Sequence, residues 1–313
     1  PIYKVKQLSR EVDNIINNPE PAWTKKPADL DDAEYKKFYS ELYPATFEEP
    51  LFHIHLNVDY PFKLTGILYF PKLSNNIQVQ KNKINLYSNQ VFITDNVENI
   101  VPEFLTILHG VIDSPDIPLN VSRSYLQEDK HVKQISSHIS KKVADKLASM
   151  FKKDRVDFEA KWDDIKVFME YGALTDEKFF DRIKKSLLFK NTENEFFTLA
   201  QYEEKIKATQ TDKDNRVVYL YTDNTEDQHV FIESAKNKGY DVLLFDTPLT
   251  PHYVQFLETK LEKASFARVD ADTIDKLIKK DEAITSNLTE DQEKELKEVI
   301  DKLMDTKSYS VQF

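Results

Sequence analysis

Residues 217–221 read Val-Val-Tyr-Leu-Tyr, and residues 242–245 read Val-Leu-Leu-Phe. Continuous apolar runs of this length are expected of strands that are covered on both faces. A helical pattern follows each run, and a third short strand is predicted at 265–269. Because strands that alternate with helices pair in parallel, the pattern predicts a small α/β/α sandwich with a short parallel sheet, which we place at residues 211–280.

A larger layered α/β unit is predicted upstream, at residues 21–153. Residues 52–58 alternate apolar and polar side chains, a period typical of a half-buried strand. Further strands are predicted at 64–70, 84–87 and 91–94.

Three helices are predicted to flank these strands. Apolar residues spaced three and four apart predict a short helix ending near Leu42 and a longer core-facing helix from Val132 to Leu147. Asp95 with Glu98 predicts the start of a third, with its apolar face running to Leu108.

Residues 154–210 predict a helical connector between the two units. One apolar stripe runs from Phe158 to Met169, and Gly172 suits the left-handed position that ends a helix. Thr175 and Thr198 are predicted to open two further helices. At the two ends, residues 1–20 are interpreted as a linker, and residues 281–313, with a helix at 290–304 and a strand at 308–313, as the start of a third domain.

Bulk composition limits the classes of function. The net charge of −11 disfavours non-specific nucleic-acid binding, and no apolar run reaches the length needed to cross a membrane. Without cysteine the chain has no disulfide, thiolate metal site or cysteine nucleophile, and a cytoplasmic location is expected. The four glycines lie far apart, which excludes a glycine-rich phosphate loop. The chain starts at Pro1 rather than methionine, so we expect a fragment.

The most informative polar segment runs from Asp113 to Gln127. Ser124 with Gln127 is typical of a capping box, which places Arg123 just outside a helix start. A guanidinium beside a positive helix end suits a phosphate. Since the chain has no phosphate cradle, this arginine is interpreted as one offered to a phosphate held elsewhere. Alternatively, Arg123 caps a carbonyl or pairs with Asp113 or Asp116.

Other residue pairs carry weaker indications. His53 and His55 lie two apart on one strand face, a spacing that can hold a metal, but no third ligand is evident, so no metal site is predicted. Ser122 lacks an evident base, so a serine nucleophile is not favoured. Three adjacent carboxylate pairs are better explained by helix starts and solvated faces: Asp31-Asp32, Asp163-Asp164 and Glu203-Glu204.

Trp23 stands between two prolines in a polar segment. It either fastens the linker to the domain or serves as an aromatic anchor for an apolar partner.

Four motifs carry a resemblance to a known family. They are Pro-Ala-Trp-Thr-Lys-Lys-Pro at 21–27, Leu-Thr-Gly-Ile-Leu-Tyr-Phe-Pro at 64–71, Val-Phe-Ile-Thr-Asp at 91–95 and Ile-Pro-Leu-Asn-Val-Ser-Arg-Ser-Tyr-Leu-Gln at 117–127. Together they resemble the middle domain of the ninety-kilodalton heat-shock chaperones, in particular the bacterial high-temperature protein G branch. The resemblance implies a middle domain followed by the first part of a C-terminal domain.

The resemblance also implies roles for single residues. Arg123 matches the catalytic-loop arginine that reaches ATP in the neighbouring domain, and Asn120 and Gln127 match polar residues of the same loop. Phe92 matches a residue supporting the junction with the nucleotide domain, and Trp23 matches one linked to client contacts. Residues 88–90 read Ser-Asn-Gln where eukaryotic members tend to carry basic residues, so no phosphate contact is carried over there.

The function implied is that of the middle segment of an ATP-dependent molecular chaperone. Its nucleotide, with magnesium, would be held by an N-terminal domain outside this chain, so the fragment alone is predicted to bind no cofactor and to be inactive as an ATPase. The implied partners are unfolded or partly folded client proteins, its own N-terminal domain, and a second copy in a dimer formed through the C-terminal domain; nucleic acid and membranes are not among them. The alternative is a non-catalytic interaction scaffold in which Arg123 is structural.

Overall fold

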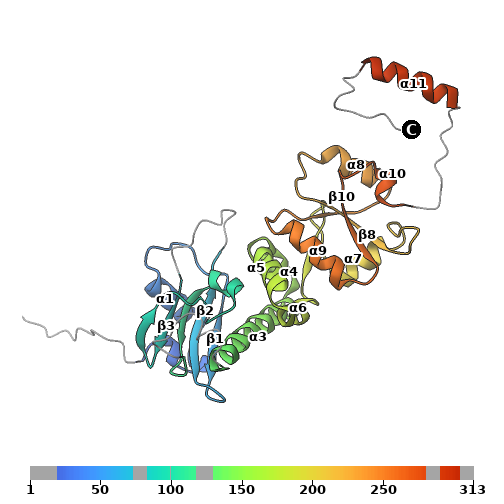
Figure 1. Ribbon diagram of the computed structural model, residues 1–313. Coiled ribbons are helices and arrows are strands. Elements are labelled where there is room, and N and C mark those ends of the chain that lie inside the picture. Colours follow the sequence, from blue (N-terminus) through green and yellow to red (C-terminus); the bar gives the residue numbers. More distant parts are fainter. Residues whose placement is uncertain (1–19, 73–82, 99, 118–129, 280–289, 304–313) are drawn as a thin grey trace, which may run out of the picture.

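Two α/β units joined by helices make up the fold, as the sequence predicts (Figure 1). The computed structural model describes residues 20–72, 83–98, 100–117, 130–279 and 290–303. Nothing is described of the predicted strand at 308–313 or of nearly all of the predicted linker.

The larger unit contains a five-stranded sheet in the order β1-β2-β5-β3-β4. Its neighbours pair antiparallel, except that β3 and β5 run parallel. The strands are β1 Phe52–Val58, β2 Leu64–Phe70, β3 Ile84–Ser88, β4 Val91–Thr94 and β5 His109–Asp113. The predicted strands at 52–58, 64–70, 84–87 and 91–94 are therefore confirmed.

Helices cover both faces of this sheet. On one face, Tyr35 and Tyr39 of α1 (Asp32–Leu42) share a buried cluster with Ile67 and Tyr69 of β2. On the other face, α3 (Lys130–Lys153) buries the predicted stripe from Val132 to Leu147, and the part from Ile135 onward lies in the main core. Because β2 and β5 lie between the two layers, nearly all of their side chains are buried.

The predicted helix over 95–108 is wrong. Among the described residues of this segment, only a short 3-10 turn, η3 (Glu103–Ile107), forms, and Pro102 before it has a non-helical backbone. A proline inside a helix removes one hydrogen bond and clashes with the preceding turn. The apolar residues of the segment are nevertheless buried: Val97, Ile100, Val101, Phe104, Leu105 and Leu108.

The connector contains four helices and one β-hairpin. Helices were predicted there, but the hairpin was not. The helices are α4 Arg155–Ala160, α5 Trp162–Thr175, α6 Glu177–Ile183 and α7 Leu199–Ile206; the hairpin strands are β6 Leu188–Lys190 and β7 Phe196–Thr198. The capping box of Thr198 with Gln201 is confirmed.

Two predicted helix boundaries in the connector are wrong. Gly172 lies inside α5 rather than after it, and a Cβ there would lie 2.5 Å from the Phe179 ring, so the glycine permits close helix packing. Asp176, not Thr175, caps α6 by accepting a hydrogen bond from the amide of Phe179.

The smaller unit is the predicted parallel sandwich. Its strands, β8 Val217–Thr222, β9 Val242–Leu244 and β10 Ala264–Arg268, are all parallel in the order β10-β8-β9. Val218 and Leu220 of β8 pack in one cluster with α8 (His229–Asn237) and the residues around α10 (Ile274–Leu277), whereas Tyr219 packs with α9 (Thr250–Lys260). Gly239, two residues after the end of α8, takes a positive φ of 74°, a conformation that glycine adopts readily at helix ends.

One further helix, α11 (Glu290–Leu303), confirms the helix predicted at 290–304. No helix in the described part of the chain is both long and apolar enough to span a bilayer.

Candidate functional site

Asp113, the last residue of β5, organises the strand end from which residues 118–129 depart. Its Oδ2 accepts hydrogen bonds from Nε1 of Trp23 at 3.2 Å and from the backbone amide of Gln90 at 2.9 Å. A carboxylate that accepts two N–H groups is fixed in orientation. Three segments distant in sequence therefore meet at one oxygen atom.

Trp23 is held by packing as well as by this hydrogen bond. Its ring lies 5.1 Å from Tyr87 and 5.6 Å from Phe38, centroid to centroid, and the residue is 7% exposed. The ring is thus buried in the larger unit, whereas nearly all of the linker that it was predicted to fasten lies outside the described residues. Its contact with a client or partner stays a prediction.

The β3–β4 hairpin lies beside the end of β5, where its turn contacts Asp113. Asn89 and Gln90 take positive φ angles of 50° and 65°, which turn the chain sharply and aim the Gln90 amide at Asp113. On β4, Phe92 packs edge-on against Tyr87 with 5.6 Å between ring centroids. Phe92 is nevertheless 54% exposed and its neighbour Val91 62%, so this edge strand presents apolar surface.

The residues after Asp113 are anchored to the β1–β2 connection. Ser114 donates its hydroxyl to the carbonyl of Lys63 at 2.7 Å, and the amide of Lys63 donates to Oδ2 of Asp116 at 2.7 Å. The amide of Ser114 also donates to the Tyr87 carbonyl at 3.1 Å. Hydrogen bonds therefore hold Ser114 and Asp116, which precede segment 118–129, to neighbouring parts of the larger unit.

The residues with predicted catalytic roles, Asn120, Arg123 and Gln127, lie outside the described residues, as do Ser122 and Ser124. The described chain resumes at Lys130, at the start of α3. Thus Trp23 and Phe92 are brought to one strand end with Asp113, while the roles assigned to the other three stay predictions.

His53 and His55 pack against α1 rather than facing open solvent. The His53 ring stacks on Tyr35 with 3.7 Å between centroids, and Nδ1 of His55 shares a hydrogen bond with the Tyr35 hydroxyl at 2.8 Å. Burial lowers the pKa of both, that of His53 to about 4. Among the described residues, no three histidine or acidic side chains form a group suited to a metal.

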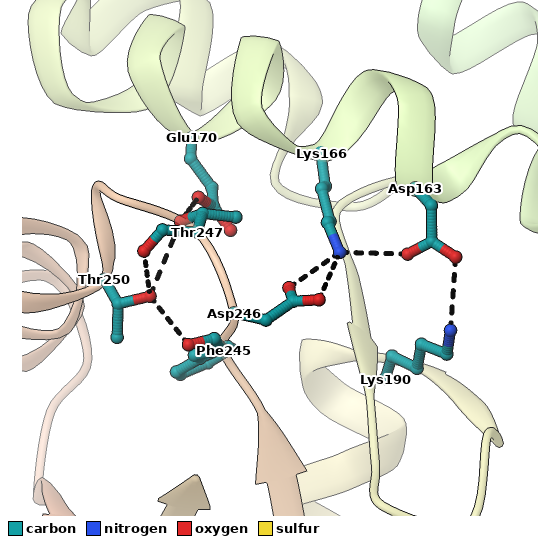
Figure 2. A network of polar contacts seen from close by, with 8 residues as sticks. All are labelled: Asp163, Lys166, Glu170, Lys190, Phe245, Asp246, Thr247 and Thr250. Carbon is teal, nitrogen blue, oxygen red and sulfur yellow. Dashed lines mark hydrogen bonds and ion pairs between the residues drawn. The ribbon is translucent and has the colours of Figure 1, made fainter. Parts of the chain in front are cut away.

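A second polar cluster joins the connector to the smaller unit (Figure 2). Nζ of Lys166, on α5, lies 2.6 Å from Oδ1 of Asp246 and 3.0 Å from Oδ1 of Asp163, and Asp163 also binds Lys190. One turn further along α5, Glu170 is 5% exposed and accepts a hydrogen bond from Thr247. Glu170 was not among the predicted functional residues; its position beside Met169 on an apolar helix was the available indication.

The sequence as a whole matches the model of one protein family, described as Hsp90 protein, over residues 2–313. The chain belongs to the Hsp90 family. The predicted resemblance is therefore confirmed.

Bacterial HtpG chaperones are among the similar Hsp90 sequences. The chain is 59% identical over 277 residues to Chaperone protein htpG of Bacteroides fragilis strain YCH46, covering 88% of this chain and 40% of that protein. It is 58% identical over 285 residues to Chaperone protein HtpG of Porphyromonas gingivalis strain ATCC 33277, covering 91% and 42%. The chain thus spans about two fifths of the length of these relatives.

A solved structure shares the fold of this Hsp90 chain. The middle domain of a heat shock protein from Plasmodium falciparum superposes with a TM-score of 0.61 at 22% identity, covering 80% of this chain and all of that one. Similarity at this identity concerns the fold alone.

Proposed function

We propose that this chain is the middle segment of an ATP-dependent molecular chaperone that acts on unfolded or partly folded client proteins. Its membership of the Hsp90 family over residues 2–313 carries the proposal. The complete protein would be a cytoplasmic homodimer, joined through a C-terminal domain that starts near residue 281.

Within that protein, Arg123 supplies positive charge to ATP, with its magnesium, held by an N-terminal domain outside these 313 residues. An arginine supplied by another domain stabilises the charge that develops during phosphoryl transfer. Asn120 and Gln127 position the loop. The described structure supports this assignment because the strand end before residue 118 is fixed by Asp113, Ser114 and Asp116.

The glycines of the chain support a nucleotide site elsewhere. Gly66 and Gly110 lie where a Cβ would come within 2.4 Å and 2.0 Å of backbone oxygen atoms of neighbouring strands. Gly172 serves helix packing and Gly239 a turn. All four are used by the fold, and none forms part of a phosphate-binding loop.

The exposed pair Val91 and Phe92 is proposed as the apolar part of the junction with the nucleotide domain. Both residues lie on the edge strand β4, next to the strand end that Asp113 organises. Closure of the two domains over this surface would exclude water and bring the loop to the nucleotide. Trp23 would support the same surface, because it packs against Tyr87, which in turn contacts Phe92. A client or partner would bind at the segment that carries Trp23.

The test is Arg123→Ala in the full-length protein. We expect ATP turnover to fall at least about a hundredfold while the affinity for ATP changes little, because the arginine acts on charge that develops in the reaction. Turnover close to that of the unsubstituted protein would contradict the assignment. The isolated 313-residue chain should not hydrolyse ATP.

The alternative is a scaffold in which Arg123 is structural, paired with Asp113 or Asp116. It predicts that Arg123→Ala lowers the thermal stability of the isolated chain. A matched control is Arg155→Ala, since Arg155 donates to Glu159, Gln201 and the Phe196 carbonyl and must cost stability when removed. Under the catalytic proposal, Arg123→Ala should have the same melting temperature as the unsubstituted chain, and Arg155→Ala should have a lower one.

A further inference from the structure

A groove of about 720 Å³ lies between α3, α6 and the turn that joins β1 to β2. Five cationic side chains line it: Lys130, Lys133 and Lys141 from α3, and Lys178 and Arg182 from α6. All five residues are exposed. The chain as a whole carries a net charge of −11, so the charge of the groove is opposite in sign to that of the molecule.

Among the described residues, little neutralises the positive charge of the groove. None of the five cationic side chains forms an ion pair or hydrogen bond within the described part of the chain, whereas most other cations of the connector do. Asp176, the one acid among the described lining residues, already accepts hydrogen bonds from the Ser140 hydroxyl at 2.7 Å and the Phe179 amide at 3.0 Å. The positive field also reaches His138, whose pKa is lowered by burial and then by Lys142 and Lys141.

The spacing of the cations indicates the kind of anion. Lys130 and Lys141 are eleven positions apart on one helix, about 16 Å at 1.5 Å per residue. Lys178 and Arg182 follow one face of α6 across the groove. A single phosphate would need donors converging on one point, whereas an extended peptide of about five residues spans the same length with a carboxylate at every second position.

The floor of the groove argues against a nucleic acid. Single strands bind by stacking bases on exposed aromatic rings along a basic path. Here the aromatic lining residues Phe62 and Phe179 are buried, and Phe62 packs edge-on against His138 with 5.7 Å between centroids. Their ring faces are unavailable for stacking.

We infer that the groove between α3 and α6 is a docking site for an acidic peptide segment of a partner protein, held by Lys130, Lys133, Lys141, Lys178 and Arg182. The five cations contact carboxylates along the segment, and the apolar floor receives the uncharged side chains between them. The inference is independent of the role proposed for Arg123, because it concerns binding to this chain alone.

The probe is a fluorescein-labelled peptide of about nine residues in which Glu alternates with Ser, titrated with the 313-residue chain at about 50 mM salt and read by fluorescence anisotropy. We expect saturable binding that weakens as salt rises, and no binding of the same peptide with Gln in place of Glu. The double variant K133E/K178E should weaken binding at least about tenfold. Lack of binding by the unsubstituted chain would overturn the inference.

The matched control is K207E/K213E, which makes the same change in net charge at two exposed lysines outside the groove. It should weaken binding less than about twofold, because distant exposed charges are screened. All four lysines are exposed, so both double variants should keep the melting temperature of the parent chain. The variant K133Q/K178Q makes a smaller change in charge and should lose an intermediate amount of peptide affinity. Equal losses in the two double variants would show a general charge effect and overturn the site. An oligothymidylate of the same charge is the second probe. If it bound as tightly as the peptide and lost as much affinity in K133E/K178E, the assignment of an acidic peptide to the groove would be wrong.

Discussion

Thr247 donates its hydroxyl hydrogen to Oε2 of Glu170 across 2.5 Å, between the loop before α9 and the middle of α5 (Figure 2). This hydrogen bond joins the connector to the smaller unit at a point shielded from solvent. Burial raises the pKa of Glu170 to about 7; the bond from Thr247 and the charge of Lys166 lower it, and Asp246 raises it. The carboxyl group therefore changes its protonation near neutral pH.

Stability should depend on pH through Glu170. Its pKa is about 7 in the folded chain and near 4.5 ordinarily, so between these values the folded state binds more protons than the unfolded state. The contribution of Glu170 to the free energy of unfolding is fully present below pH ~4.5 and is lost as pH rises through ~7, on the order of 3 kcal/mol in all. Urea unfolding of the chain and of Glu170→Gln at pH 5 and pH 8 measures it.

The difference between pH 5 and pH 8 should shrink in Glu170→Gln, because the amide cannot ionise. Glu226→Gln is the control, since that glutamate is exposed on the smaller unit and should leave the pH dependence intact. An unchanged difference in Glu170→Gln would show that other groups set the pH dependence.

Gly172→Ala should destabilise the packing of α5 against α6. The added Cβ would lie 2.5 Å from the Phe179 ring and 3.0 Å from the Phe104 ring, both in buried residues, so the rings must shift. Overpacking of this kind costs about 1–3 kcal/mol. Gly239→Ala is the comparison: nothing lies within 4 Å, but its positive φ should cost about 1 kcal/mol by strain alone. In thermal unfolding, Gly172→Ala should lose at least as much stability as Gly239→Ala. An unchanged melting temperature of Gly172→Ala would contradict the packing argument.

Local periodicity predicted most of the strands because it is a property of neighbouring residues. The strand Leu64–Phe70 was predicted to the residue, and the sandwich followed from apolar runs separated by helices. The segment 95–108 failed because its apolar spacing fits a helix, while Pro102 prevents one. The central strand β5 was missed: its five residues include Gly110, and its extended form depends on pairing with β2 and β3.

The site was predictable only in part, for the same reason. Phe92 and Trp23 were recognised from short motifs, but their common neighbour Asp113 was considered only as a partner of Arg123. Trp23 and Asp113 are 90 positions apart, and their hydrogen bond follows from the three-dimensional fold. A carboxylate that ends a buried strand was the one local indication of its role.

Asp113→Ala should loosen the strand end at β5. It leaves Nε1 of the buried Trp23 and the Gln90 amide without their acceptor, which costs about 1–3 kcal/mol. Asp113→Asn retains an acceptor oxygen and should cost less. Denaturation followed by tryptophan fluorescence measures both, with Trp162→Phe as the background so that Trp23 alone reports. Equal stability of Asp113→Ala and the parent would show that packing against Tyr87 and Phe38 suffices to hold the ring.

Arg155→Ala should separate α4 from the hairpin and α7. The guanidinium donates to Oε1 of Glu159 at 2.7 Å, to Oε1 of Gln201 at 3.0 Å and to the carbonyl of Phe196 at 2.9 Å. Three hydrogen bonds with a charged donor, partly exposed, should be worth about 1–2 kcal/mol together. Arg155→Lys has no planar fork and can satisfy only part of this set, so its melting temperature should fall between those of the parent and Arg155→Ala. If the lysine variant matched the parent, charge alone, rather than the geometry of the guanidinium, would hold these elements together.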